Sequence, residues 1–339
     1  MQLECRERPA RFSERLHARY GCAFCALPLC GLSFARFLRP KDAVRGAMSY
    51  PAALRFLFLN QPTTRCYIAR QAEGASIPRI IHQTYRSQDA LPPSIRESIA
   101  ELRERNPGWD YRFYDDDAMT GFIREAYGPG VLAYFDRIDP RYGAARADLF
   151  RYLLMYRVGG IYLDIKSTVR RSLDEILLPD DRLILAHWPR NSRFRDSGRH
   201  DWDFGDRIPG GELQQWHVMC VAGHPYLYAV IQAVMRNIEC YIPRMHGSGR
   251  TAVLRLSGPI AYTLAMLPLL PLNHHRLVAG HEQLGLDYSV YPENTDHKRL
   301  FQTHYADLTA PIVRPTPFRR GLSVLYGAFD AFRRRWRKN

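Results

Sequence analysis

The stretch that most constrains the fold is Arg146–Ser167, which reads RADLFRYLLMYRVGGIYLDIKS. Its first half places apolar residues three and four apart, which predicts one buried face of an amphipathic helix. Two glycines supply the helix stop and a tight turn, and Ile161–Ile165 then predicts a buried strand. Asp164 interrupts that strand with a charge, which is unfavourable unless the carboxylate binds something. An ion pair with a neighbouring arginine is the simplest explanation for a lone aspartate, but this helix–turn–strand context favours ligand binding.

Strands and helices alternate on both sides of this block. Ile77–Thr84 predicts a first buried strand, 94–105 a helix, and Trp109–Tyr114 a second strand. Further on, Leu183–Ala186 and Trp216–Val221 predict strands, and a helix follows. This alternation predicts an α/β fold with a largely parallel sheet, and such folds bind ligands beyond the carboxyl ends of their strands.

Two helix starts are marked by polar residues. Ser94 with Glu97 three residues later resembles a capping box. The acidic triplet Asp115–Asp117 predicts the N-terminus of a helix over Ala118–Tyr127, where carboxylates oppose the helix dipole. A catalytic role for the triplet is the alternative.

Charge is distributed unevenly along the 339 residues. The net charge is +14, and residues 314–339 hold eight Lys or Arg and one Asp, which is half of it. In the same segment apolar residues follow intervals of four and three, the pattern of a basic amphipathic helix on an anionic membrane surface. The alternative is a C-terminal helix that packs on its own domain. The apolar positions are Phe318, Leu322, Leu325, Phe329, Phe332 and Trp336.

We therefore divide the chain into an N-terminal appendage and linker (1–76), a compact domain (77–313) and a basic C-terminal helix (314–339). The apolar stretch Gly21–Ala35 is short and contains Pro28, which predicts either a signal-like or membrane-associating segment or sequence upstream of a start at Met48. The seven cysteines include one CxxC pair and no second pair at zinc-finger spacing. They predict reduced thiols of a cytosolic protein.

Five blocks in order resemble glycosyltransferase family 32, the DXD-containing sugar transferases similar to the initiating outer-chain mannosyltransferases. The resemblance implies a GT-A type fold, with a Rossmann-like, mostly parallel sheet flanked by helices. It also implies a nucleotide-sugar donor (a UDP- or GDP-sugar), a divalent cation, usually Mn²⁺, and transfer with retention at the anomeric carbon. The blocks are IPRIIHQTY (77–85), NPGWDYRFYDDD (106–117), RADLFRYLLMYRVGGIYLDIKS (146–167), VAGHPYL (221–227) and SGPIAYT (257–263).

By this resemblance, Asp148 and Arg151 contact hydroxyls of the donor sugar, and Asp164 is the first aspartate of the DXD motif. Lys166 stands where the family has the second aspartate. An ammonium cannot ligate a metal, so two outcomes are open. Asp164 still holds the metal with help from the diphosphate and another side chain, which we favour, or Lys166 itself neutralises the diphosphate. Strand alternation predicts that Asp164 and Lys166 share a face.

Other site residues follow from the same resemblance. His304 is a candidate to complete the metal shell, with a surface or core histidine as the alternative. Next to the nucleotide we expect His82, with Tyr85 available to stack on the base and Tyr162 as a further donor contact. Gln215 is a candidate catalytic residue beside the sugar, and a buried amide that serves the backbone is the alternative. Catalytic roles are therefore predicted for Asp164, Lys166 and Gln215.

The predicted function is a retaining glycosyltransferase that acts on a glycan or lipid-linked acceptor, in polysaccharide or lipopolysaccharide synthesis. We place it in the cytoplasm, peripheral on the inner membrane face. The alternative is a catalytically degenerate nucleotide-sugar or glycan-binding protein in which Lys166 marks the lost activity. Nucleic-acid binding is disfavoured, because half of the excess charge lies in one helix and no base-reading motif is present.

Overall fold

The computed structural model describes residues 59–60, 63–188, 211–291 and 307–336. The chain divides into two compact units, 1–57 and 58–339, and every described residue belongs to the second. The predictions for Gly21–Ala35, for the CxxC pair and for His304 fall outside the described residues.

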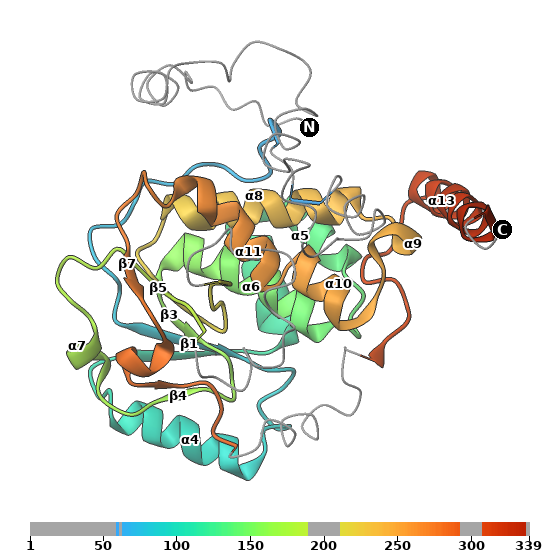
Figure 1. The fold of residues 1–339 in the computed structure, drawn as a ribbon. Helices are drawn as coiled ribbons and strands as arrows, with labels where there is room; N and C mark the ends of the chain where they lie inside the picture. Colours follow the sequence, from blue (N-terminus) through green and yellow to red (C-terminus); the bar gives the residue numbers. More distant parts are fainter. Residues whose placement is uncertain (1–58, 61–62, 189–210, 292–306, 337–339) are drawn as a thin grey trace. The chain divides into compact units, whose positions relative to one another are not determined.

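A six-stranded sheet in the order β2-β1-β3-β6-β5-β7 forms the middle of this unit (Figure 1). The pairs β1–β2, β1–β3 and β5–β7 are parallel, and β6 is antiparallel to both of its neighbours. Five strands therefore run one way and β6 runs the other. This mostly parallel sheet with helices on both faces confirms the predicted α/β fold. The strands are β1 (Ile80–Thr84), β2 (Asp110–Tyr114), β3 (Gly160–Leu163), β5 (Leu183–Ala186), β6 (His217–Cys220) and β7 (Arg276–Val278).

The two faces of the sheet are covered by different helices. Tyr162 of β3 points into the larger core, with α5, α6, α8, α10 and α11, whereas Ile161 and Leu163 point into a second core with α4 and α7. The period-two alternation of a strand thus separates the two cores. The helices are α4 (Pro93–Glu104), α5 (Asp116–Arg137), α6 (Gly143–Val158), α7 (Leu173–Ile176), α8 (Pro225–Cys240), α9 (Pro243–His246), α10 (Gly249–Leu256), α11 (Pro259–Met266) and α13 (Pro317–Trp336). A small second sheet pairs β4 (Thr168–Val169) with β8 (Leu286–Asp287), and 3-10 turns lie at η3 (Leu267–Leu269) and η4 (His281–Leu284).

Helix α6 is buried on all sides rather than on the single face that its pattern predicted. Every residue from Asp148 to Tyr156 is buried. The helix lies against the sheet and packs against α5 and α8 in the larger core, so even its charged positions face protein. Asp148 and Arg151 are therefore interior residues, which the periodicity of the apolar residues could not reveal.

The predicted helix starts have different outcomes. Asp115 is the N-cap of α5, and its carboxylate accepts a hydrogen bond from the Ala118 N–H at 2.8 Å, as predicted. The cap assigned to Ser94 is wrong, because α4 begins at Pro93 after an N-cap at Pro92. A proline is suited to the first helical position, and the Ser94 hydroxyl instead lies 2.8 Å from the Tyr291 hydroxyl.

The compact unit extends to the N-terminal side of the predicted boundary at Ile77. Leu59, Tyr67 and Ile68 are buried, and the Tyr67 N–H donates to the Gln232 side chain of α8 at 3.0 Å. Further along the unit, Gly249–Leu269 is long and apolar enough to cross a membrane, but 61% of its most apolar 18-residue window is buried inside the protein. It forms α10 and α11, which are separate helices of the core.

Candidate functional site

Two glycines fix the turn that joins α6 to β3. Gly159 and Gly160 have φ of 73° and 102°, a region that L-residues with side chains rarely adopt. A Cβ at Gly159 would lie 2.6 Å from the Ala222 nitrogen, and one at Gly160 would lie 2.7 Å from the Ile80 oxygen. The chain can therefore reverse here only because these residues lack a side chain, and the reversal brings the end of β3 back beside α6.

Arg151 is the centre of a buried polar cluster at that place. Its Nη2 lies 2.9 Å from Oδ1 of Asp164 and 3.5 Å from Oδ1 of Asp148. Its Nη1 donates to the backbone oxygen and to Oε1 of Gln215, both at 2.7 Å. The guanidinium carbon lies 4.7 Å from the centre of the Tyr162 ring. One guanidinium thus orients two carboxylates and an amide, as its planar set of donors allows.

The carboxylate of Asp148 is held by residues from three elements. Its Oδ2 accepts from the Ser257 hydroxyl at 2.9 Å, and its Oδ1 accepts from Nε2 of Gln215 at 3.1 Å. Burial raises the pKa of Asp148, while Arg151 and Ser257 oppose that shift. For Arg151, burial alone would lower the pKa, but Asp164 and other neighbours more than offset it, so the guanidinium stays charged.

Asp164 is the partly exposed carboxylate of this cluster, and Gln215 is also of intermediate exposure. Its side chain is 26% exposed, against 5% for Arg151 and 4% for Asp148. Its N–H donates to the Trp216 oxygen at 2.8 Å, and its own oxygen accepts from the Ser167 N–H at 2.8 Å. Asp164 therefore lies in a tight turn just past β3. The two explanations given for its charge, an ion pair and ligand binding, are compatible here. It is ion-paired with an arginine, and it is also open to a ligand.

Lys166 lies in the same turn, and strand alternation does not decide its direction, because β3 ends at Leu163. The side chain is 9% exposed, and Nζ lies 3.8 Å from the centre of the Tyr288 ring. That ring in turn packs edge-on against Trp216 and Trp188, with centroids 5.3 and 5.2 Å away. Among the residues that the structure describes, no carboxylate lies within 4.0 Å of the ammonium.

His82 does not lie at the exposed edge of this cluster. It is fully buried, with Nδ1 at 3.1 Å from the Tyr114 hydroxyl and Nε2 at 3.0 Å from the Gly159 oxygen. Burial lowers its pKa to about 4, so the imidazole is neutral. The structure thus places it as a link between β1, β2 and the glycine turn. Tyr85 is buried in a separate small cluster with Ile95.

Gln215 lies in the cluster, and two further members, Tyr152 and Ser257, were not predicted. The Tyr152 hydroxyl donates to Oε1 of Gln215 at 3.2 Å and to the Ser257 oxygen at 2.9 Å. Ser257 is the first residue of the SGPIAYT block, so the family resemblance could have pointed to it as a site residue. For Tyr152 the helix pattern indicates only an apolar position. Glu212, which precedes Gln215 in the same segment, is buried.

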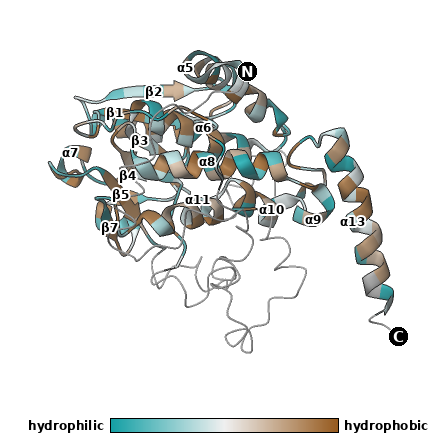
Figure 2. Ribbon diagram, turned by 90° about the horizontal axis from the view of Figure 1, so that it is seen from above, coloured by the Kyte–Doolittle hydropathy of each residue, from teal (hydrophilic) through white to brown (hydrophobic). Residues whose placement is uncertain are grey.

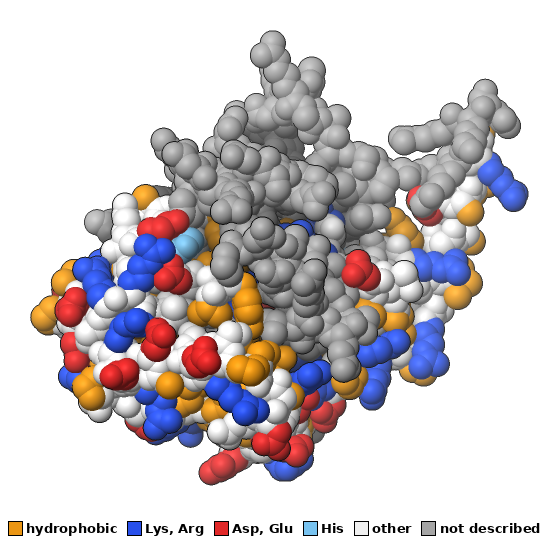
Figure 3. Space-filling model, turned by 90° about the horizontal axis from the view of Figure 1, so that it is seen from below, with side chains coloured by type: hydrophobic (Ala, Val, Ile, Leu, Met, Phe, Trp, Pro, Cys, Tyr) orange, Lys and Arg blue, Asp and Glu red, His pale blue; other side chains and the backbone are white. Residues whose placement is uncertain are grey.

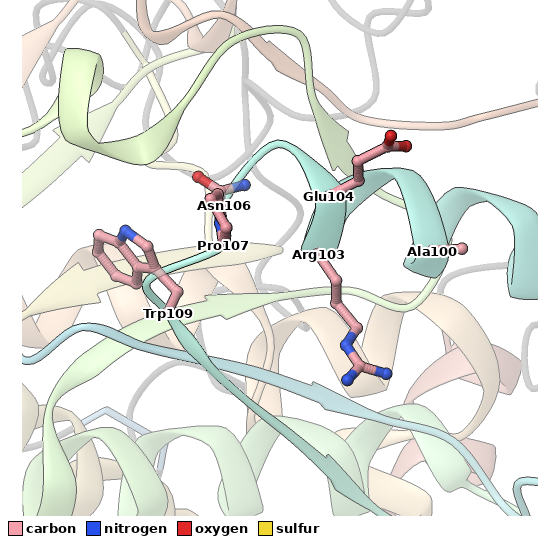
Figure 4. A pocket seen from close by; sticks show the side chains of 6 residues that line it. All are labelled: Ala100, Arg103, Glu104, Asn106, Pro107 and Trp109. Carbon is pink, nitrogen blue, oxygen red and sulfur yellow. The ribbon is translucent and has the colours of Figure 1, made fainter.

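A separate surface hollow of about 420 Å³ lies at the C-terminal end of α4 (Figure 4). Two of its polar groups are already used within the protein: the Asn106 amide donates to Leu102 and accepts from Leu173, and the Trp109 indole donates to Asp174. None of its lining residues belongs to the Arg151 cluster. They are Ala100, Arg103, Glu104, Asn106, Pro107 and Trp109.

Residues 92–183 match the family described as "Glycosyltransferase sugar-binding region containing DXD motif". We call residues 92–183 the DXD-type region, because they resemble the DXD-containing region of sugar transferases. The match contains Asp148, Arg151, Asp164 and Lys166. It ends before Gln215, which lies just before β6 in the chain. It confirms the family resemblance drawn from the five sequence blocks.

Known relatives of the DXD-type region are sugar transferases. Inositol phosphoceramide mannosyltransferase 3 of Schizosaccharomyces pombe is 34% identical over 31% of this chain and 28% of its own length. Initiation-specific alpha-1,6-mannosyltransferase of the same yeast is 24% identical over 58% of this chain and 49% of its own length. The chain therefore spans half or less of each relative. Among solved structures, the ligand-free glycosyltransferase domain from the YGT toxin has a TM-score of 0.45 and 10% identity, over 74% of this chain and 89% of that domain.

The described residues of the DXD-type region do not form a suitable site for a divalent cation. DXD-type transferases generally use such an ion, which prefers several anionic oxygen ligands. Here Asp164 is ion-paired with Arg151, and Lys166 replaces the second aspartate. Within the described ranges, no group of three or more His, Cys, Asp or Glu side chains is arranged to hold a metal. His304, the other predicted ligand, lies outside those ranges.

Proposed function

We propose that this protein is a retaining glycosyltransferase that moves a sugar from a nucleotide-sugar donor to a glycan or lipid-linked acceptor. The observation that carries the proposal is the Arg151 cluster, which orients Asp148, Asp164 and Gln215 inside a region that matches sugar transferases. Preorganised charges and amides of this kind recognise sugar hydroxyls without rearranging. The relatives named above are mannosyltransferases, which supports a hexose as the transferred group in polysaccharide or lipopolysaccharide synthesis.

In this proposal each member of the cluster has its own task. Asp164 presents its exposed carboxylate to the donor, and Arg151 holds that carboxylate in one orientation. Gln215 is fixed by two hydrogen bonds from Arg151, one of them through its backbone oxygen, and by the Asp148 carboxylate. Because its amide is already oriented, Gln215 is suited to position the sugar for transfer rather than to accept a proton.

Incubation with a panel of UDP- and GDP-sugars tests the proposal. We expect hydrolysis or transfer with one donor, and retention of anomeric configuration in the product by NMR. Asp164→Asn should reduce turnover at least tenfold, since it removes the charge but keeps the size of the side chain. Asp110→Asn, at an exposed ion pair with Arg112, is the control and should leave turnover unchanged. Binding of a donor without transfer or hydrolysis would show the degenerate protein instead, and no binding of any donor would refute the proposal.

We also propose that α13 attaches the protein to an anionic membrane, at the inner face in the cytoplasm. The helix contacts α9 through small residues: the Ser323 hydroxyl accepts from the Arg244 N–H at 3.2 Å, and Gly327 lies against the Arg244 side chain. Most of its large apolar residues are exposed instead of packing on the domain, and Figure 2 shows hydrophobic stretches along the ribbon of α13. The exposed fractions are 69% for Phe318, 67% for Leu325, 54% for Phe329, 66% for Phe332 and 78% for Trp336.

Arginines accompany this apolar face. Figure 3 shows basic and hydrophobic side chains together along α13, at the right of that view. An exposed apolar face of this size is uncommon on a protein that stays in solution, and its arginines complement acidic lipid headgroups. The name of one relative specifies an inositol phosphoceramide substrate, which supports a lipid-linked acceptor for this chain as well.

Vesicle co-sedimentation tests the membrane proposal. We expect the full chain to bind vesicles that contain phosphatidylglycerol, to bind phosphatidylcholine vesicles much less, and to dissociate as salt screens the charges. The double variant Phe329→Ser, Phe332→Ser should lose at least tenfold in affinity. Equal binding of the variant and the parent, or equal binding to both vesicle types, would contradict the proposal.

A further inference from the structure

We propose that the Lys166 ammonium takes the place of the divalent cation at the donor diphosphate, so that donor binding and transfer need no metal. This inference rests on the proposed function, because it concerns the same donor. It departs from the general behaviour of DXD-type transferases, and three features of the turn after β3 support it.

The first feature is the isolation of the Lys166 charge. Lys166 is only 9% exposed, and no carboxylate of the described residues pairs with its ammonium. Its contact is the face of the Tyr288 ring, whose centre lies 3.8 Å from Nζ, and such a contact is weaker than an ion pair with a carboxylate. Its Nζ is not fully enclosed by the protein, so a ligand can reach the ammonium, and no described carboxylate neutralises it. A site of this kind is completed when an anion binds to it.

The second feature is the rigidity of the turn that carries both Asp164 and Lys166. The Asp164 N–H is bonded to Trp216, and the Lys166 oxygen accepts from the Val290 N–H at 2.8 Å. The Ser167 hydroxyl donates to the Tyr288 oxygen at 2.8 Å. The turn is therefore held from β6 on one side and from 288–290 on the other. Both residues therefore lie in one fixed turn just past the end of β3, the edge of the sheet at which an α/β fold binds its ligand.

The third feature is the charge of the cluster. Asp148, Asp164 and Arg151 are joined by ion pairs and have a formal charge of −1 together. Lys166, in the same turn as Asp164, adds one positive charge, so the four side chains are formally neutral. An aspartate at position 166 would bring the same set to a net charge of −2. The difference between the two sets equals the charge of one divalent cation. The lysine thus supplies positive charge for which a pair of aspartates would need a bound metal ion.

In the transfer step the bond between the anomeric carbon and the diphosphate oxygen breaks, and a bond from that carbon to the acceptor hydroxyl oxygen forms. The hydroxyl proton passes to the departing diphosphate. The Lys166 ammonium stabilises the negative charge that develops on the leaving oxygen. Its ammonium can donate up to three hydrogen bonds to phosphate oxygens.

The test is titration of the whole protein with UDP, GDP and the active donor, in EDTA and in Mn²⁺. We expect affinity and turnover in EDTA to lie within about twofold of those in Mn²⁺. Lys166→Met should weaken diphosphate binding at least tenfold in both buffers, and Lys166→Asp should make binding depend on Mn²⁺. Arg96→Met, which removes a charge from the exposed side of α4, is the control and should bind as the parent does.

A second measurement guards against misfolding of the variants. Lys166→Met removes a buried, unpaired charge, so its thermal unfolding midpoint in the absence of ligand should be equal to or higher than that of the parent. Binding that EDTA abolishes and Mn²⁺ restores would overturn the inference, and so would metal-free binding that Lys166→Met leaves intact. Both results would leave the glycosyltransferase proposal standing, whereas a failure to bind any donor in either buffer would overturn that proposal itself.

Discussion

Nη2 of Arg151 lies 2.9 Å from Oδ1 of Asp164, and this ion pair joins a helix interior to an accessible surface. The arginine side chain is 5% exposed and the aspartate 26%. A ligand that reaches Asp164 therefore meets a carboxylate whose orientation is set from inside the protein. The same arginine holds Asp148 and Gln215, so a substitution of Arg151 removes a contact from all three of these side chains.

Arg151→Met should destabilise the protein severely. It leaves the buried Asp148 without its positive partner, and loss of one member of a buried pair costs about 3–5 kcal/mol. Urea unfolding followed by circular dichroism measures the change. The control is Arg79→Met, at an ion pair with Asp174 in which both side chains are about half exposed. Its loss should stay below about 1 kcal/mol, and similar losses for the two variants would show that the Arg151 contacts are not special.

Ser257→Ala tests the contact that the helix pattern did not reveal. The change removes the hydroxyl that donates to Oδ2 of Asp148 at 2.9 Å and leaves a buried carboxylate oxygen without that donor. The free energy of unfolding should fall by about 1–3 kcal/mol, and turnover of the donor should fall with it. Ser94→Ala, at an exposed position of α4, should change stability by less than about 0.5 kcal/mol.

Stability should depend on pH through His82. Its pKa in the folded state is lowered to about 4 by burial, whereas the ordinary value is 6.5. Between these values the unfolded chain binds a proton that the folded chain excludes, so stability is complete above about pH 6.5 and falls as the pH drops toward 4. The full effect is about 3 kcal/mol. His217 and His224 have lowered pKa values of about 3 and about 4 and act in the same direction.

Urea unfolding at several pH values from 7.5 down to 4.5 measures this dependence. His82→Gln should be less stable than the parent at pH 7.5 but should lose less stability on acidification, by the contribution of one proton. Parallel curves for the parent and the variant would mean that His82 does not exclude its proton in the folded state.

Gly159→Ala should prevent the turn between α6 and β3 from closing. The residue has φ of 73°, and the new methyl group would lie 2.6 Å from the Ala222 nitrogen. A loss of more than about 2 kcal/mol is expected, visible as a lower thermal midpoint or as insoluble expression. Gly130→Ala is the matched control, because no heavy atom lies within 4 Å of its added Cβ inside α5. It should be neutral or stabilising by about 0.5–1 kcal/mol.

The double variant Phe329→Ser, Phe332→Ser should leave the unfolding transition unchanged within about 0.5 kcal/mol. Both side chains are more than half exposed on α13, so they contribute little to the packing of the domain. Thermal unfolding in buffer without lipid measures this. A clear loss of stability would mean that the apolar face of α13 packs on the domain in solution, which is the alternative weighed from the sequence.

The sequence was sufficient for features that depend on neighbouring residues. The strand–helix alternation, the Asp115 cap and the glycine turn all follow from local patterns. Asp148, Arg151 and Asp164 were assigned to one site through a resemblance, and the structure brings them together.

What could not be predicted depends on residues far along the chain. Charged residues on a helix suggest a solvent-facing side, yet Asp148 and Arg151 are interior because Gln215 and Ser257 meet them there. The apolar run through Ile165 suggests a longer strand, but β3 ends at Leu163 because bonds to Trp216 and Tyr288 fold the next residues into a turn. The role of His82 also depends on distant residues, because its two hydrogen-bond partners come from β2 and from the glycine turn.

The cluster around Arg151 also has a consequence for how the chain folds. Its charges become tolerable inside the protein only when α6, the residues before β6 and the start of the SGPIAYT segment have all docked. A folding intermediate with α6 buried and either of the other segments undocked would hold an ion pair short of hydrogen bonds, and such a state is high in energy. Partly assembled molecules should therefore be sparsely populated. A chain that has passed this barrier therefore has the Arg151 cluster, the candidate site, fully assembled as soon as it is folded.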